Sequence, residues 1–180
     1  MIRVGLGRGW VLGVFALTLI GCSAIGGVRG PTTSEASEWT ARDAAIMAVL
    51  DRYLAGLNAL DLEAHVSTYH FPHFRYASGE ISVWKTALEA IPILDVPEAE
   101  RLRAVRAALE PEWVRSEWRR REIVQGDDEK VHVATRFVRL RADGSVIKTF
   151  DSLYVMTFEA DDAGSGSPRW AIKGRSSFAP

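Results

Sequence analysis

The chain has 180 residues, of which 47% are hydrophobic and 25% are charged, and its formal net charge at pH 7 is −1. These values are ordinary for a globular domain with its own core. The near-neutral charge argues against nucleic acid or another polyanion as a partner. Because Cys22 is the only cysteine, an intramolecular disulfide and a multi-thiolate metal site are excluded.

The first 21 residues have the pattern of a secretory signal. Arg3 and Arg8 precede a largely apolar stretch over residues 10–20, which is too short to span a bilayer as a helix. This stretch ends in Leu19-Ile20-Gly21-Cys22, which resembles the lipobox of bacterial lipoproteins. The resemblance implies that residues 1–21 are removed and that the thiol of Cys22 carries a diacylglycerol.

The same resemblance predicts an extracytoplasmic protein that is anchored to a lipid bilayer. Several acyl chains hold a protein stably, because each buried methylene contributes about 0.8 kcal/mol. Ser23, rather than aspartate, follows the cysteine. In diderm bacteria this resemblance favours the periplasmic side of the outer membrane over the inner membrane. An ordinary secretory signal and a short N-terminal anchor stay open as alternatives.

Residues 22–37 follow the cleavage point, with Cys22 lipidated as the resemblance implies. The rest of this segment is rich in glycine, serine and threonine and lacks an apolar period, so we expect a flexible tether. No second linker and no internal repeat follow, so residues 38–180 are predicted to form one domain. A helix is expected from Glu38 to Asn58, because apolar residues recur there at helical spacing. Asp61 suits the N-cap of a short second helix that reaches Tyr69.

Pro72 is expected to end this helical segment. Residues 74–77 and 81–84 then read as a hairpin that turns at Ser78-Gly79, and Pro97 suits the start of a third helix after a loop. Four long strands are expected at Val114–Gln125, Lys130–Arg141, Val146–Glu159 and Arg169–Phe178. Helices followed by an antiparallel meander indicate an α+β fold with the helices on one face of the sheet.

This element order resembles the NTF2-like superfamily, including its SnoaL-like and ketosteroid-isomerase-like branches. The residues that carry the resemblance are the helix end at 57–61, the aromatic segment at 70–75 and the final strand at 170–178. The resemblance implies a cystatin-like cone, in which a curved, mostly antiparallel sheet wraps the long helix and leaves a pocket at its mouth. It also implies dimerisation through the outer face of the sheet in many members.

The strand pattern supports a second covered face. Phe150 and Tyr154 share one side of their strand, whereas Leu153 and Val155 lie on the other side. A sheet with one wet face should alternate more cleanly. We therefore expect a homodimer, with scattered surface apolar residues as the alternative interpretation.

The densest group of functional side chains is His70, His73 and Arg75, at the place where the resemblance puts the pocket entrance. A histidine exchanges protons near neutral pH, and an arginine orients an anionic group. We expect these residues, with Tyr53 and Trp84, to bind a small apolar ligand. The alternative is that both imidazoles are held by backbone hydrogen bonds. No third metal ligand lies nearby and no phosphate-binding motif occurs, so neither a metal nor a cofactor is expected.

Asp151 is the remaining candidate, because ketosteroid-isomerase-like enzymes hold an acidic base on the sheet opposite a tyrosine. Asp151 and Tyr53 suit these parts, so the catalytic candidates are His70, His73, Tyr53 and Asp151. The strand parity, however, sets Asp151 opposite the most apolar face. Solvation, or pairing with an arginine of the neighbouring strand, is the favoured interpretation.

Three functions stay open. The leading one is a lipid-anchored domain that binds a small organic ligand or serves as an assembly module. The second is a cofactor-independent lyase, isomerase or cyclase, and the third is a structural lipoprotein whose cone is filled by its own side chains. An open cavity faced by two or more of the candidates His70, His73, Tyr53, Arg75 and Asp151 would favour the enzyme.

The lipid assignment predicts that wild-type protein incorporates labelled palmitate and that Cys22→Ala does not. The label should fractionate with membranes. A Cys22→Ala protein that still incorporates palmitate would contradict the assignment.

Overall fold

A computed structural model describes residues 33–160 and 166–178, with side chains from residue 41 onward. The helices are α1 (Thr33–Ala59), α2 (Leu62–Val66), α3 (Ala87–Ala90), the 3-10 helix η1 (Pro92–Asp95) and α4 (Glu98–Ala108). The strands are β1 (Tyr69–Ala77), β2 (Glu80–Trp84), β3 (Arg115–Gly126), β4 (Lys130–Leu140), β5 (Val146–Glu159) and β6 (Arg169–Phe178).

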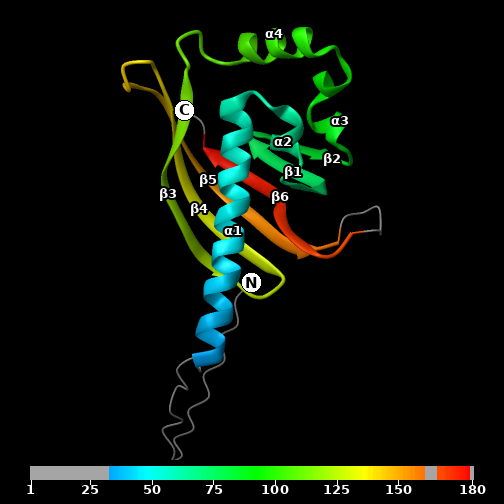
Figure 1. The fold of residues 1–180 in the computed structure, drawn as a ribbon, viewed down its shortest axis with the longest axis vertical. Helices are drawn as coiled ribbons and strands as arrows, with labels where there is room; N and C mark the ends of the chain where they lie inside the picture. Colours follow the sequence, from blue (N-terminus) through cyan, green and yellow to red (C-terminus); the bar gives the residue numbers. More distant parts are fainter. Residues whose placement is uncertain (1–32, 161–165, 179–180) are drawn as a thin grey trace, which may run out of the picture.

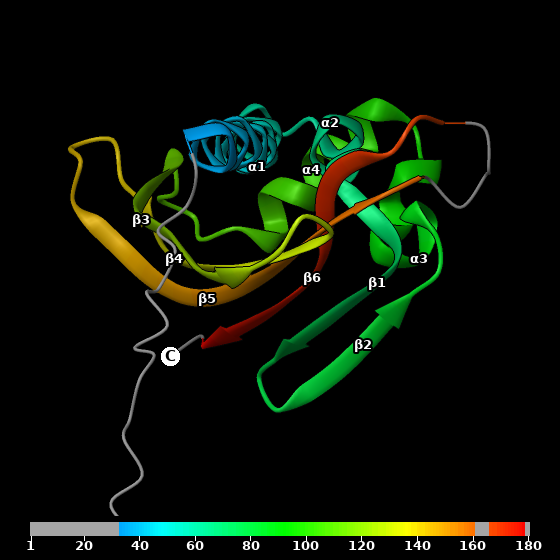
Figure 2. The ribbon, with the colours of Figure 1, turned by 90° about the horizontal axis from the view of Figure 1, so that it is seen from below.

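The strands form one curved sheet in the order β2-β1-β6-β5-β4-β3. All neighbouring pairs are antiparallel except β1 and β6, which run parallel. Helix α1 lies across the concave face, and α2, α3 and α4 gather beyond its C-terminal end (Figures 1 and 2). The α+β cone expected from the sequence is confirmed.

The main core lies between α1 and the concave face of the sheet. Helical spacing places Ile46, Leu50, Tyr53 and Leu54 on the buried side of α1. They pack against inward-facing side chains of the central strands, among them Val131, Val133, Tyr154, Met156 and Ile172. The alternation along β4 and β5 therefore separates a core face from an outer face, as the sequence parity predicts.

Two features of the backbone allow β1 to pair within the sheet, a tight turn into β2 and a glycine on β6. Ser78 and Gly79 both have positive φ, at 56° and 79°, which suits the tight turn between β1 and β2. Gly174 pairs with Phe74 across the parallel ladder, and a Cβ at this glycine would lie within 2.3–2.4 Å of the Phe74 ring. A side chain at position 174 would therefore push β1 away from β6.

The predicted elements differ from the structure mainly around β1. The second helix ends at Val66, and Tyr69 begins a strand that continues through Pro72. The strand tolerates this proline because the β1–β6 ladder is irregular between Tyr69 and Phe74, so a missing N–H breaks no regular ladder position. Helix η1 occupies the loop predicted between Pro92 and Pro97, and α3 lies just before it, where no element was predicted.

The N-terminal predictions fall largely outside the described residues. The signal segment 1–21, Cys22 and the tether up to residue 32 lie there, whereas α1 begins at Thr33, inside the segment predicted as tether. Within the described ranges, no helix combines the length and the apolar character that crossing a bilayer requires.

Candidate functional site

A cavity of about 160 Å³ opens between the C-terminal half of α1 and the concave face of the sheet. Strands β1, β4, β5 and β6 and helices α1 and α2 all contribute side chains to it. Its lining consists of Tyr53, Leu57, His65, Arg75, Phe137, Arg139, Phe150, Arg175 and Ser177. The cavity thus combines aromatic, cationic and hydroxyl groups, and no carboxylate belongs to this lining.

One wall of the cavity is aromatic. Phe137 and Phe150 are register partners on β4 and β5, and their rings stack with centroids 4.7 Å apart. The ring of Trp118, on β3, contacts Phe137 edge-on, with the two centroids 5.9 Å apart. The Arg139 guanidinium lies 5.0 Å from the centroid of Phe150 and also bonds Glu110 Oε2 at 2.6 Å. This wall offers a flat apolar surface whose neighbouring arginine already has an acidic partner.

Another part of the lining is cationic. Arg75 on β1 and Arg175 on β6 are register partners in the parallel ladder, so their side chains leave the sheet side by side. Arg175 Nη1 donates to the Tyr53 hydroxyl. Tyr154, the register partner of Arg175 on β5, is fully buried, and its hydroxyl has no hydrogen-bond partner of normal geometry. Burial, and then the charge of Arg175, lower the pKa of Arg75.

His65 closes the cavity from α2, and its tautomer follows from its partners. Its Nδ1 lies 2.8 Å from the Tyr53 carbonyl oxygen, which only accepts, so Nδ1 carries the proton. Nε2 therefore accepts from the Tyr69 hydroxyl at 3.2 Å. A Cβ at Gly56 would lie 2.7 Å from the His65 amide nitrogen, so glycine allows this close approach of α2 to α1. Burial lowers the pKa of His65 to about 4.

His73 lies behind the cavity in a stack of rings. It is fully buried between Tyr69, at 4.0 Å between centroids, and Trp84, at 5.7 Å. Its Nδ1 donates to the Ile172 carbonyl oxygen at 3.0 Å. Burial, together with the nearby charge of Arg175, lowers the pKa of His73 to about 4. His73 is therefore a neutral structural ring at pH 7.

The structure brings together only part of the site expected from the sequence. Tyr53 and Arg75 line the cavity, whereas His73 and Trp84 pack behind it. His70 lies elsewhere, because its Nδ1 contacts Thr157 Oγ1 at 3.0 Å and Glu159 Oε1 at 3.3 Å on the outer face of β5.

Asp151 is also outside the cavity. It lies on the outer face of β5, where both carboxylate oxygens accept from Arg136 at 2.8 Å. Arg136 is its register partner on β4, and the Arg136 guanidinium holds the pKa of Asp151 below its usual range. Asp151 therefore does not face Tyr53 as a base would. The observed contact is the alternative expected from the sequence, pairing with an arginine of the neighbouring strand.

Sequence reasoning missed Arg175, His65, Phe137 and Ser177 as cavity residues. Arg175 sits within the strand pattern Ile172-Lys173-Gly174-Arg175, but its partner Arg75 is one hundred positions away in the chain. Only the parallel β1–β6 register joins them. Strand parity on β6 pointed the wrong way, because Trp170 and Ile172 face the core and simple alternation would put Arg175 on the other face. The register shift between Val155 and Met156 returns Arg175 to the concave face, opposite Tyr154.

The cavity lacks a group placed to take a proton. Tyr53 accepts a hydrogen bond from Arg175, and the lone pair of His65 faces the Tyr69 hydroxyl. Burial raises the pKa of both Tyr69 and Tyr154, so neither phenol ionises near neutral pH. No group of three or more His, Cys, Asp or Glu side chains in the described part of the chain is placed to hold a metal ion. The arrangement suits binding better than proton transfer.

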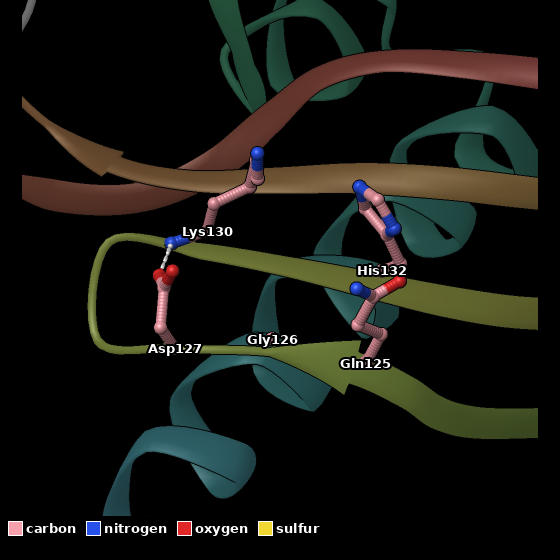
Figure 3. Close-up of a pocket in the computed structure, with 5 residues that line it drawn as sticks. All are labelled: Gln125, Gly126, Asp127, Lys130 and His132. Atoms are coloured by element: carbon pink, nitrogen blue, oxygen red, sulfur yellow. Dashed lines mark hydrogen bonds between the residues drawn. The ribbon is translucent and has the colours of Figure 1, made fainter. Parts of the chain in front are cut away.

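A second hollow of about 190 Å³ lies at the turn between β3 and β4, lined by Gln125, Gly126, Asp127, Lys130 and His132 (Figure 3). The Asp127 carboxylate accepts from the backbone N–H groups of Glu129 and Lys130, which hold the turn and lower its pKa. His132 projects from the face opposite Val131 and Val133. This hollow is shaped by a turn and has no aromatic wall.

The family model described as NTF2-like protein (DUF6841) matches residues 42–162. The matched range contains α1 from residue 42 onward and β1 to β5, but β6 with Arg175 lies beyond it. No curated protein is significantly similar to this chain.

Solved structures share the fold. An NTF2-like protein with a cystatin-like fold from Novosphingobium aromaticivorans has a TM-score of 0.56 at 12% identity, over 85% of this chain and 92% of that one. An NTF2-like protein of unknown function from Shewanella oneidensis has a TM-score of 0.51 at 17% identity, over 75% and 97%. A putative ketosteroid isomerase from Shewanella frigidimarina also reaches 0.51, at 12% identity, over 76% and 97%. At these identities the likeness concerns the fold alone.

The buried histidines predict acid sensitivity. Between pH 6.5 and about 4 the unfolded chain binds protons that folded His65 and His73 exclude, so stability falls as pH falls through this window. Each histidine should cost about 2 kcal/mol of unfolding free energy on going from pH 7 to pH 5. Nitrogen-15 NMR should show both rings neutral and Nδ1-protonated at pH 5, alongside urea unfolding at both pH values. Ring signals that titrate near pH 6.5 would contradict this account.

Proposed function

This chain belongs to the NTF2-like protein family DUF6841, and from that premise we propose that it is a membrane-anchored, extracytoplasmic lipoprotein whose domain binds a small organic ligand. The observation that carries the ligand proposal is the cavity between α1 and the concave sheet face. The lipobox pattern at Leu19 to Cys22 supports the anchor.

The size and lining of the cavity support a ligand with one aromatic ring. An apolar cavity of about 150 Å³ in another protein is large enough to hold benzene. The cavity here has about 160 Å³, and the stacked rings of Phe137 and Phe150 form one wall. Aromatic side chains provide large contact areas for a planar ligand. A cone filled by its own side chains fits this observation less well.

Two of the five candidate residues, Tyr53 and Arg75, face the cavity, which meets the simple count expected for an enzyme. The chemistry of these two residues nevertheless argues against an enzyme. A lyase or isomerase of this kind needs a base within reach of the substrate. Arg75 is a cation and Tyr53 accepts from Arg175, whereas His70, His73 and Asp151 all lie outside the cavity lining. Binding is therefore the better supported function.

Blocking the cavity tests the proposal. Ser177 lines the cavity, and the neighbouring Ser176 lies on the opposite face of the same strand. Ser177→Phe should weaken binding of benzyl alcohol about tenfold or more, because the new ring occupies the ligand space. Ser176→Phe should leave binding unchanged. NMR titration of the delipidated domain measures both, and circular dichroism checks the fold, since overpacking typically costs about 1–3 kcal/mol. Equal binding by both variants would contradict the proposal.

We also propose that the domain forms a homodimer through the outer face of the sheet. Tyr76 on β1, Ile81 on β2 and Phe178 on β6 lie on this face, and all three are exposed, Ile81 and Phe178 to more than 70%. Burying such side chains against a second copy removes apolar area from water. Leu153 and Val155 extend the apolar character along β5.

If the domain dimerises, sedimentation equilibrium of the delipidated protein should show a mass that rises with concentration. Ile81→Glu should shift the equilibrium to monomer, because a charge would be buried at the interface. Glu80→Gln at the same hairpin is the control. A monomeric mass for the wild type at high concentration would contradict the dimer.

A further inference from the structure

Two arginines that face the cavity lack acidic partners. Among the described residues, neither Arg75 nor Arg175 forms an ion pair, although they are register partners on adjacent strands. The ionisable neighbours of this pair are Arg175 beside Arg75 and the phenols of Tyr53, Tyr69 and Tyr154, and none of them is a carboxylate. Like charges directly opposite each other destabilise a sheet. The pair is thus an uncompensated concentration of positive charge.

Part of the hydrogen-bonding capacity of this pair is also unused. The Nε atoms of Arg75 and Arg175 are buried and have no hydrogen-bond partner in the described part of the chain. The buried Tyr154 hydroxyl beside Arg175 likewise has none of normal geometry. Buried donors without partners are rare in folded proteins, and each one calls for an explanation.

Several other arginines in the described part of the chain have acidic partners. Arg136 is bonded twice to Asp151, Arg139 to Glu110 and Arg141 to Glu112. Even on the exposed surface, Arg120 bonds Glu122. The absence of a carboxylate beside Arg75 and Arg175 is therefore a local feature of the cavity rather than a general property of the chain.

We propose that Arg75 and Arg175 together bind the carboxylate of a small aromatic acid whose ring lies against Phe137 and Phe150. The inference rests on the proposed ligand-binding function and names the class of ligand. A planar guanidinium donates two parallel hydrogen bonds to a carboxylate, which adds both energy and orientation. An anion between the two arginines also offsets their mutual repulsion.

The cavity dimensions restrict the class further. With about 160 Å³ and walls from four strands, the space accommodates one ring and one carboxylate and excludes nucleotides and long-chain lipids. Ser177 lines the same space, and its hydroxyl accepts a hydrogen bond from the Ser152 hydroxyl at 2.9 Å. Ser177 therefore supplies one neutral polar contact beside the charged pair.

Benzoate and benzamide test this inference, because they have nearly the same shape and differ in charge. Isothermal titration of the delipidated protein should show benzoate binding at least about tenfold more tightly than benzamide. Arg75→Gln should weaken benzoate about tenfold and leave benzamide unchanged, whereas Arg75→Lys should recover part of the loss because the charge remains. Arg75 is half-buried, so its replacement is compatible with folding.

Arg103→Gln is the matched control, since it removes the same charge from an exposed position on α4. It should leave benzoate binding unchanged at physiological salt. Equal affinities for benzoate and benzamide, or equal effects of Arg75→Gln and Arg103→Gln, would overturn the anion inference and leave ligand binding intact. If benzoate, benzamide and benzyl alcohol all fail to bind, the proposed function itself is contradicted.

Discussion

The placement of the Arg175 guanidinium on the concave face of the sheet is the constraint on which the rest of the site depends. Its Nη1 donates to the Tyr53 hydroxyl, and Tyr154 lies beside it on β5. A cation in such surroundings needs compensation, and the chain supplies only neutral phenols. Burial keeps His65 and His73 neutral, and the same positive charge contributes to this effect. The cavity therefore carries an excess of positive charge, which favours the binding of an anion.

The fold creates this site through backbone proximity. Gly174 allows β1 to pack in parallel against β6, which sets Arg75 beside Arg175. Gly56 allows α2 to approach α1, which brings His65 over Tyr53, with ring centroids 4.2 Å apart. At the other end of the cavity, the β4–β5 register stacks Phe137 on Phe150. The cavity thus has an aromatic part and a cationic part because three separate strand and helix contacts bring these residues together.

Local sequence pattern predicted much of the fold, because the apolar stripe of a helix and the alternation of a strand depend on residues that are close in the chain. Strands β5 and β6 begin and end where the sequence indicated, and strand parity set Asp151 opposite the core face. The site was harder to predict because it joins residues that are distant in the chain. Tyr53 and Arg75 were identified by type, but Arg175 gains its meaning only from the parallel ladder. His70 and His73 drew attention as a pair, although alternation along an irregular β1 sends them into different surroundings.

The most direct measurement is a crystal structure of the delipidated domain soaked with 4-bromobenzoate, with the bromine located by its anomalous scattering. We expect one strong peak beside Phe137 and Phe150, with the carboxylate directed at Arg75 and Arg175. Bromine on the outer face of the sheet alone, or a carboxylate directed away from both arginines, would contradict this expectation.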